Sequence, residues 1–137
     1  GPTYRGGVLA SVRDYLKGRA DAALDAGIEP SSLMLDPGLG FGKTVEQNYA
    51  LIDSTDEIAG LGYPVLAASS RKSFVGAVTG VATPSERVVG SDAAAVAQVL
   101  AGARLVRCHD VRAHAEGLAV ARAVLDARGA GEPLADC

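Results

Sequence analysis

Hydrophobic positions along this 137-residue chain alternate between two spacings. In four segments apolar residues recur every three or four positions, which predicts helices over residues 8–24, 46–59, 83–102 and 111–127. Short continuous apolar runs between them predict buried strands over residues 33–36, 64–68 and 104–109. A further helical segment is expected to begin at residues 71–72. Helices and strands in alternation predict parallel strands with right-handed crossovers, and hence an α/β layer or barrel.

Two of these helices carry N-terminal capping signals. Thr44 followed by Gln47 is a capping box, in which the hydroxyl accepts a backbone N–H and the glutamine reaches back. Thr83, Pro84 and Glu86 together supply an N-cap, a proline at the first helical position and a capping-box glutamate. We therefore expect one helix to begin just after Thr44 and another just after Thr83.

Polar side chains collect at the C-terminal end of each predicted strand. The first strand ends at Asp36, the second leads into Ser70, Arg71 and Lys72, and the third carries Arg107 and His109. In α/β barrels this end of the strands forms the active-site face, and open parallel sheets also bind ligands there. Because Arg107 and His109 are two positions apart, both should face the same side of their strand. The pattern predicts one site to which all three strands contribute.

Each of these residues also has a purely structural interpretation. An Asp-Pro-Gly sequence such as the one at Asp36 is most often a turn, in which the carboxylate accepts local backbone hydrogen bonds. His109 is commonly a satisfied core or capping histidine, and Asp110 is better interpreted as a helix cap than as a catalytic acid. Arg71 and Lys72 lie where the helix dipole disfavours cations, which favours an anion held nearby. The structural interpretations do not explain why the polar residues occupy equivalent strand ends.

The segment DPGLGFGKT, from Asp36 to Thr44, closely resembles a phosphate-binding loop. Its spacing fails by one residue, since Pro37 stands where that pattern requires its first glycine. Proline has no N–H to donate to a phosphate, and Asp36 would place a carboxylate beside it. We therefore predict that Asp36 binds something other than a phosphate.

The composition narrows the class of protein. The formal charge of −3, without a run of Lys or Arg, offers no surface for nucleic acid or an acidic membrane. No apolar run approaches the roughly 18 residues of a membrane span, and no signal segment opens the chain, so a cytoplasmic protein is expected. Cys108 is expected to be a buried thiol and Cys137 a free one. With two Phe and no Trp, the core should be mainly aliphatic.

Three blocks of the sequence resemble consecutive motifs of the dihydropteroate synthases. They are LMLDPGLGFGKTVEQNYALI, PVLAASSRKSFVGAV and ERVVGSDAAAVAQVLAGARLVRCHDV, and the similarity extends over residues 26–125. These transferases act in folate biosynthesis and are the target of sulfonamides. The resemblance implies a TIM (β/α)8 barrel, and this chain would supply about three parallel strands with their helices from its C-terminal part.

The resemblance also implies a role for each polar residue. It assigns pterin binding to Asp36, Lys72 and Arg107, p-aminobenzoate binding to Phe41, Arg71 and Ser73, and diphosphate binding to Arg107 and His109. Asp36 would accept the two parallel donors of the pterin ring, N3–H and the 2-amino group. The implied reaction joins 6-hydroxymethyl-7,8-dihydropterin diphosphate to p-aminobenzoate and releases pyrophosphate, with Mg²⁺ held by ligands mostly outside this chain. No residue here is assigned as a general acid, a general base or a metal ligand.

The length departs from that family. A complete barrel has about 250 residues and eight strands, so residues 3–128 are expected to form a partial, pterin-binding barrel. Residues 1–2 are expected to be an expression scar and residues 129–137 a flexible tail. We expect such a C-terminal fragment to be inactive alone. Its uncovered strand edges and inner face predict a homodimer or a swapped oligomer.

Two alternatives stay open at this point. A pterin-binding methyltransferase domain shares the barrel and the pterin aspartate, but is not expected to carry the Ser-Arg-Lys-Ser sequence. A non-catalytic paralogue would bind the pterin without turning it over. Titration with a pterin and with p-aminobenzoate separates the synthase from the methyltransferase, because only the synthase needs both sites.

Overall fold

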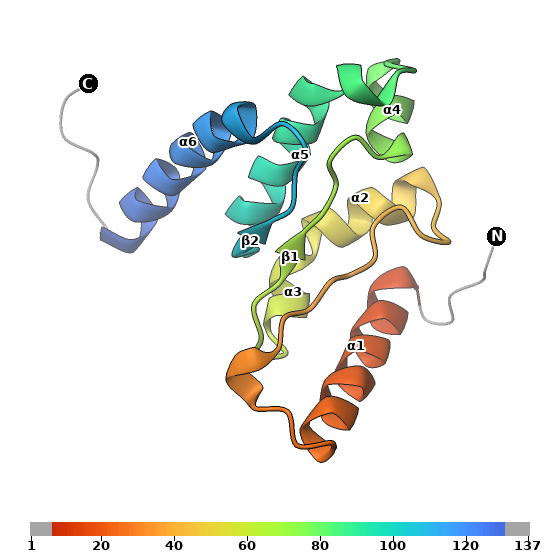
Figure 1. Cartoon of the computed structure of the whole chain (residues 1–137), viewed down its shortest axis with the longest axis vertical. Coiled ribbons are helices and arrows are strands. Elements are labelled where there is room, and N and C mark those ends of the chain that lie inside the picture. The colour runs from red at the N-terminus through yellow and green to blue at the C-terminus, as the bar shows by residue number, and fades with distance from the viewer. Residues whose placement is uncertain (1–6, 131–137) are drawn as a thin grey trace.

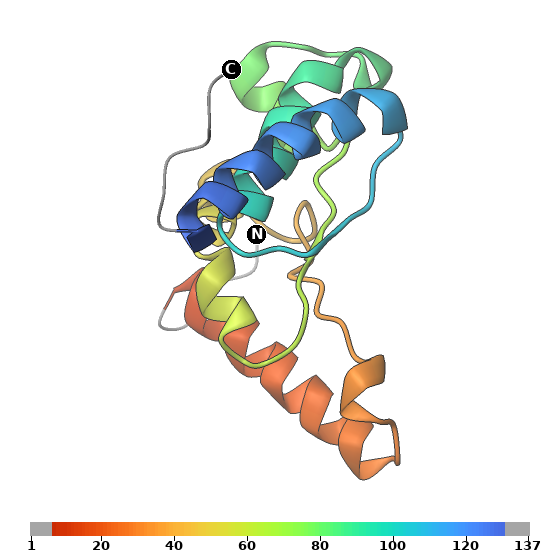
Figure 2. The same cartoon turned by 90° about the vertical axis from the view of Figure 1, so that its left-hand side faces the viewer.

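The computed structural model describes residues 7–130, which form a chain of helices and short strands in alternation (Figures 1 and 2). In chain order the elements are α1 (Val8–Asp25), the 3₁₀ turn η1 (Pro30–Ser32), α2 (Val45–Asp53), α3 (Thr55–Ala59), β1 (Leu66–Ala67), α4 (Ser73–Thr79), the 3₁₀ turn η2 (Pro84–Glu86), α5 (Val88–Leu100), β2 (Leu105–Val106) and α6 (Val111–Ala130). The predicted expression scar, and residues 131–137 of the predicted tail, lie outside the described residues.

Three segments pair in parallel, in the order of the chain. Leu35 makes a parallel bridge with Val65, and β1 pairs with β2 so that Leu66 lies opposite Leu105. The three predicted parallel strands are confirmed, although the first is reduced to the bridge at Leu35 and the third to two residues. Within residues 7–130 each outer segment has a neighbour on one side only, so each leaves an unpaired edge.

The helices cover one side of this sheet. The strand segments run in front of α2 and α3 in Figure 1 and to the right of α3 in Figure 2. The most deeply buried apolar side chains are mainly aliphatic, as expected, and include Leu39, Leu51, Ile58, Val65 and Phe74. The Phe74 ring meets the edge of Tyr49, with ring centroids 5.4 Å apart, and the Tyr49 hydroxyl donates to the Phe74 carbonyl oxygen at 2.9 Å.

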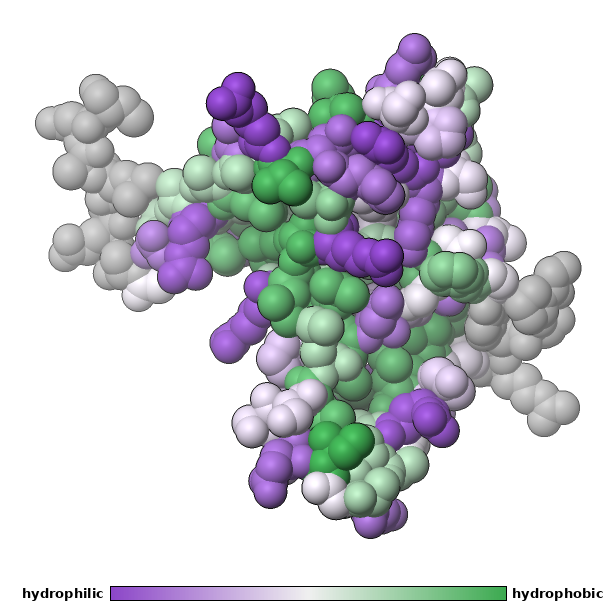
Figure 3. Space-filling model, in the orientation of Figure 1, coloured by the Kyte–Doolittle hydropathy of each residue, from purple (hydrophilic) through white to green (hydrophobic). Residues whose placement is uncertain are grey.

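The other side of the sheet is open. Figure 3 shows this face, on which a band of hydrophobic residues runs down the middle between hydrophilic side chains. Met34 and Leu105, in or beside the strand segments, are 48% and 44% exposed. Parallel strands are normally buried on both faces, and no described residue forms a layer over this one.

The helix predicted over residues 46–59 is wrong as a single element. Ser54 interrupts it and separates α2 from α3. The buried Thr55 hydroxyl donates to the Ile52 carbonyl oxygen at 2.7 Å, a local bond of the kind that competes with regular helix. The capping box that begins α2 is confirmed: the Gln47 N–H donates to Thr44 Oγ1 at 3.1 Å, and the Thr44 N–H donates to Gln47 Oε1 at 2.8 Å.

The helix start predicted at Thr83 is also wrong. Thr83 precedes only the short turn η2, its side chain makes no capping hydrogen bond, and α5 begins at Val88. The Arg87 guanidinium folds back and donates to the carbonyl oxygens of Val81 and Ala82, at 2.8 and 2.9 Å. These bonds hold the chain in a bend where a regular helix would otherwise continue.

The last helix is longer than predicted. α6 extends to Ala130, so Gly129, where the flexible tail was expected to begin, is helical. Neither α6 nor any other helix within residues 7–130 is long and apolar enough to cross a membrane.

Candidate functional site

The predicted strand-end residues, with the exception of Arg71, meet in one cavity. It has a volume of about 260 Å³ and is lined by Asp36, Phe41, Ala68, Ser70, Lys72, Arg107 and His109. Contributions from all three strand ends, and the shared orientation of Arg107 and His109, are thereby confirmed. A larger cavity of about 870 Å³, between α5, β2 and α6, is lined mainly by apolar residues. We regard the smaller cavity as the candidate site because polar and charged groups from all three strand ends converge there.

The loop after Asp36 does not have the arrangement of a phosphate-binding loop. Lys43 Nζ donates to the carbonyl oxygens of Gly38 and Phe41, at 2.7 and 2.9 Å, so the loop itself binds its ammonium group. The Asp36 carboxylate accepts the Gly38 N–H at 2.9 Å, the local bond expected of an Asp-Pro-Gly turn. Burial lowers the pKa of Lys43, and the nearby Asp36 carboxylate partly opposes that shift.

The side chains of Asn48 and Lys72 both bind the backbone of the loop after Asp36. Asn48, 2% exposed on α2, accepts the Gly40 N–H at 2.7 Å and donates to the Thr44 carbonyl oxygen at 2.9 Å. Lys72 Nζ donates to the Leu39 carbonyl oxygen at 2.6 Å. Sequence reasoning missed Asn48, because an Asn within a helical segment looks like an ordinary surface residue until its burial is known.

Lys72 lies at the centre of the charged groups. Its ammonium is 5.0 Å from the centre of the Phe41 ring, and that ring is itself 70% exposed. Burial lowers the pKa of Lys72; Asp36 opposes this shift, and the positive charges of Arg107 and Lys43 add to it. Lys72 therefore loses its proton more readily than an exposed lysine does.

Ser70 orients the histidine of the site. Its hydroxyl lies 2.8 Å from His109 Nδ1 and accepts the His109 backbone N–H at 3.1 Å. The buried serine thus holds the His109 ring through one contact and the His109 backbone through the other, at the cavity wall. Cys108, the preceding residue, is a free thiol of intermediate exposure. It is therefore less buried than predicted.

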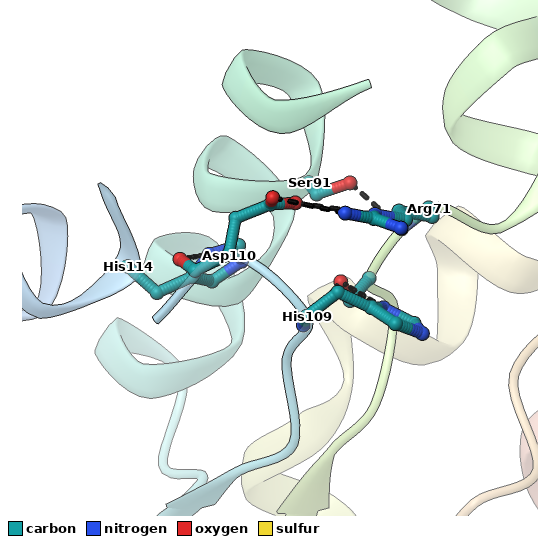
Figure 4. A network of polar contacts seen from close by, with 6 residues as sticks. Arg71, Ser91, His109, Asp110 and His114 are labelled. Atoms are coloured by element: carbon teal, nitrogen blue, oxygen red, sulfur yellow. Dashed lines mark hydrogen bonds and ion pairs between the residues drawn. The ribbon is translucent and has the colours of Figure 1, made fainter. Parts of the chain in front are cut away.

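Arg71 does not line the cavity and pairs with Asp110 (Figure 4). Nη2 and Nε of Arg71 donate to the two carboxylate oxygens of Asp110 at 3.0 and 3.3 Å. The hydrogen bond from Arg71 is the main reason why the pKa of Asp110 lies below its ordinary value. Neither Arg71 nor Ser73 lines the cavity, and their proposed contact with p-aminobenzoate stays a prediction.

Comparison with known proteins places this chain among pterin-binding proteins. The family described as Pterin binding enzyme matches residues 2–109. Dihydropteroate synthase of Neisseria meningitidis serogroup B is 47% identical over 122 residues, which are 87% of this chain and 42% of that protein.

Solved structures give the same result. Dihydropteroate synthase from Thermus thermophilus in complex with 4-aminobenzoate aligns with a TM-score of 0.84 at 48% identity, over 90% of this chain and 49% of that chain. The complex with 6HMPPP from the same organism aligns with a TM-score of 0.83 at 48% identity, over 89% of this chain and 48% of that chain. The predicted fold, part of a TIM (β/α)8 barrel, is confirmed, and this chain spans less than half the length of these relatives.

Proposed function

This chain belongs to the pterin binding enzymes, and on that premise we propose that the protein works as a dihydropteroate synthase. The observation that carries the proposal is the cavity in which Asp36, Lys72, Arg107 and His109 converge from three strand ends. Relatives 47% and 48% identical to this chain have that name, and two of their structures contain 4-aminobenzoate or 6HMPPP.

The pterin is proposed to bind along Asp36 and Lys72. A carboxylate accepts two parallel N–H donors, and the pterin ring presents such a pair at N3 and its 2-amino group. Lys72 would donate to the ring carbonyl and the adjacent nitrogen. Arg107 would lie against the ring face, where a planar guanidinium stacks well. The bond from Gly38 to the Asp36 carboxylate supports this role, because it orients the acceptor before a ligand arrives.

The reaction would take place between this pterin and an aminobenzoate bound beside Phe41. The aromatic amine attacks the methylene carbon of the pterin; the new C–N bond forms as the C–O bond to the diphosphate breaks, and the nitrogen loses a proton. Negative charge develops on the departing pyrophosphate. We name Lys72, Arg107 and His109 the anion corner, since these three groups would stabilise that charge from fixed positions.

Magnesium, which the resemblance implies, finds no fitting site in the described residues. Mg²⁺ prefers several oxygen ligands in octahedral geometry. Within residues 7–130 no group of three or more His, Cys, Asp or Glu side chains could hold a metal ion, and the cavity has one carboxylate among positive charges. We therefore assign no magnesium ligand to these residues and no reaction step to the metal.

Calorimetric titration with 6-hydroxymethylpterin and with p-aminobenzoate tests the proposed function. We expect the pterin to bind this chain, because its three proposed contacts are present. In a protein of the relatives' full length both ligands should bind, whereas a methyltransferase-type domain would bind the pterin only. If the pterin bound neither this chain nor the full-length protein, the synthase, the methyltransferase-type domain and the pterin-binding paralogue would all be excluded.

Sulfate binding at the anion corner should weaken at alkaline pH. The Lys72 pKa lies below its ordinary 10.5 because of burial, so its positive charge is lost at a lower pH than that of an exposed lysine. Sulfate itself does not titrate there, so NMR titrations at about pH 7 and about pH 10 report on the protein. In Lys72→Arg the affinity should change much less between the two pH values, and an equal loss in both proteins would refute this role for Lys72.

A further inference from the structure

The backbone of Arg71 is in an uncommon conformation. Its φ of 61° makes it the one non-glycine residue within the described part of the chain with a positive φ. Residues other than glycine keep such a conformation where several contacts impose it, and these positions gather at functional sites. Arg71 lies between Ser70 and Lys72, which both line the cavity, while its own side chain points to Asp110.

Contacts from two separate elements hold Arg71 in this conformation. The Ser91 hydroxyl, on α5, accepts the Arg71 N–H at 2.8 Å, and Arg87 Nη1 donates to the Arg71 carbonyl oxygen at 2.8 Å. Asp110, just before α6, accepts both hydrogen bonds of the side chain (Figure 4). We name Arg71, Arg87, Ser91 and Asp110 the Arg71 clamp. Gly76 leaves room for it, because a Cβ there would lie 2.6 Å from Arg87 Nε.

The clamp lies directly beside a second link between the same two loops. Ser70 and His109 make two contacts with each other, at 2.8 and 3.1 Å, and each is the chain neighbour of a clamp residue. The loop from β1 to α4 and the loop from β2 to α6 are thus joined twice. The Ser70–His109 contacts join them at the cavity, and the Arg71–Asp110 ion pair joins them next to it in the chain. Lys72 and His109 of the anion corner are carried by these two loops.

We propose that Arg71 and Asp110 are a positioning pair, whose ion pair holds Lys72 and His109 at a fixed separation in the anion corner. This inference rests on the proposed function, since an anion is the ligand that the arrangement would serve. It gives Arg71 a role different from the p-aminobenzoate contact that the family resemblance implies.

Asp110→Asn tests the pair, because positioning and charge predict opposite results. Removing a negative charge beside the anion corner should, by charge alone, strengthen the binding of inorganic pyrophosphate. If the pair positions Lys72 and His109, the substitution should instead weaken that binding about three- to tenfold. Asp21→Asn is the matched control, because Asp21 makes an exposed ion pair with Lys17 at 3.0 Å, far from any clamp residue in sequence.

Amide hydrogen exchange supplies a second readout that needs no ligand. In Asp110→Asn we expect the Arg71 and His109 amide protons to exchange about tenfold faster than in the wild type, whereas α1 amides should not change. Unchanged exchange at both positions, or unchanged or tighter pyrophosphate binding, would overturn the proposal. If wild-type protein binds no pyrophosphate, the anion-binding role of the corner in this chain fails, and the exchange rates alone decide whether the pair holds the two loops.

Arg71→Lys covers the case in which Asp110→Asn does not fold. It keeps the positive charge but cannot make the two-pronged contact with a carboxylate. Pyrophosphate affinity should again fall about threefold or more, whereas charge alone predicts no change. If p-aminobenzoate binding were lost while pyrophosphate binding stayed at the wild-type level, Arg71 would be a substrate contact and not a positioning residue.

Discussion

Asp36→Asn should weaken binding of 6-hydroxymethylpterin about 30- to 100-fold, or by about 2–3 kcal/mol. The carboxylate is proposed to accept two N–H donors of the pterin, and an asparagine can accept only one of them. Its NH₂ group would meet the second donor without an acceptor between them. The substituted side chain can still accept the Gly38 N–H through its oxygen, so the loop should keep its shape and the change should report on the ligand contact.

Asp21→Asn again serves as the control for Asp36→Asn. It removes the same charge from an exposed position on α1, where Asp21 pairs with Lys17. Calorimetric titration of both variants should show wild-type affinity in the control and the large loss only at Asp36. Equal affinities in the three proteins would refute the role of Asp36.

This chain alone should release no pyrophosphate from a dihydropterin diphosphate and p-aminobenzoate. It spans 42% of the length of its Neisseria relative and 49% of the Thermus one. The described residues provide the proposed pterin contacts, but offer no magnesium site, and they line the anion corner from three strand ends only. Stabilisation of the departing pyrophosphate would therefore be incomplete in this chain. Because the rate depends on groups that stabilise the transition state, we expect no measurable turnover.

The same open face should make the chain associate with itself. Apolar surface beside the strands, and the two sheet edges that no segment within residues 7–130 pairs with, favour a second copy over a solitary monomer. Sedimentation velocity should show dimers or larger oligomers, and a pyrophosphate-release assay on the same sample should show no turnover. Turnover by a stable monomer would contradict both expectations.

Much of the fold followed from the sequence, because its strongest signals are local. The alternation of apolar periods identified the three parallel segments, and the Thr44 capping box marked the start of α2 correctly. The Thr83 signal was equally strong but failed, since the Arg87 guanidinium binds the Val81 and Ala82 carbonyl oxygens and bends the chain first. No local pattern reveals a side chain that turns back on its own loop.

Part of the candidate site could also be predicted from the sequence, namely the residues at the strand ends. Residues at equivalent strand ends must converge in a parallel sheet, so Asp36, Lys72 and His109 could be grouped before their distances were known. The partners that orient them could not be found in this way. Asn48 and Ser91 each accept a partly buried hydrogen bond from a backbone N–H elsewhere in the chain, and these bonds depend on tertiary packing rather than on a motif.

A crystal structure of this chain with 6-hydroxymethylpterin is the most direct test of the account. We expect the pterin in the cavity between Asp36, Lys72 and Arg107, with the ring edge on the Asp36 carboxylate and the Arg107 guanidinium against the ring face. Pterin bound instead in the apolar cavity between α5, β2 and α6, with the strand-end cavity empty at saturating ligand, would contradict it.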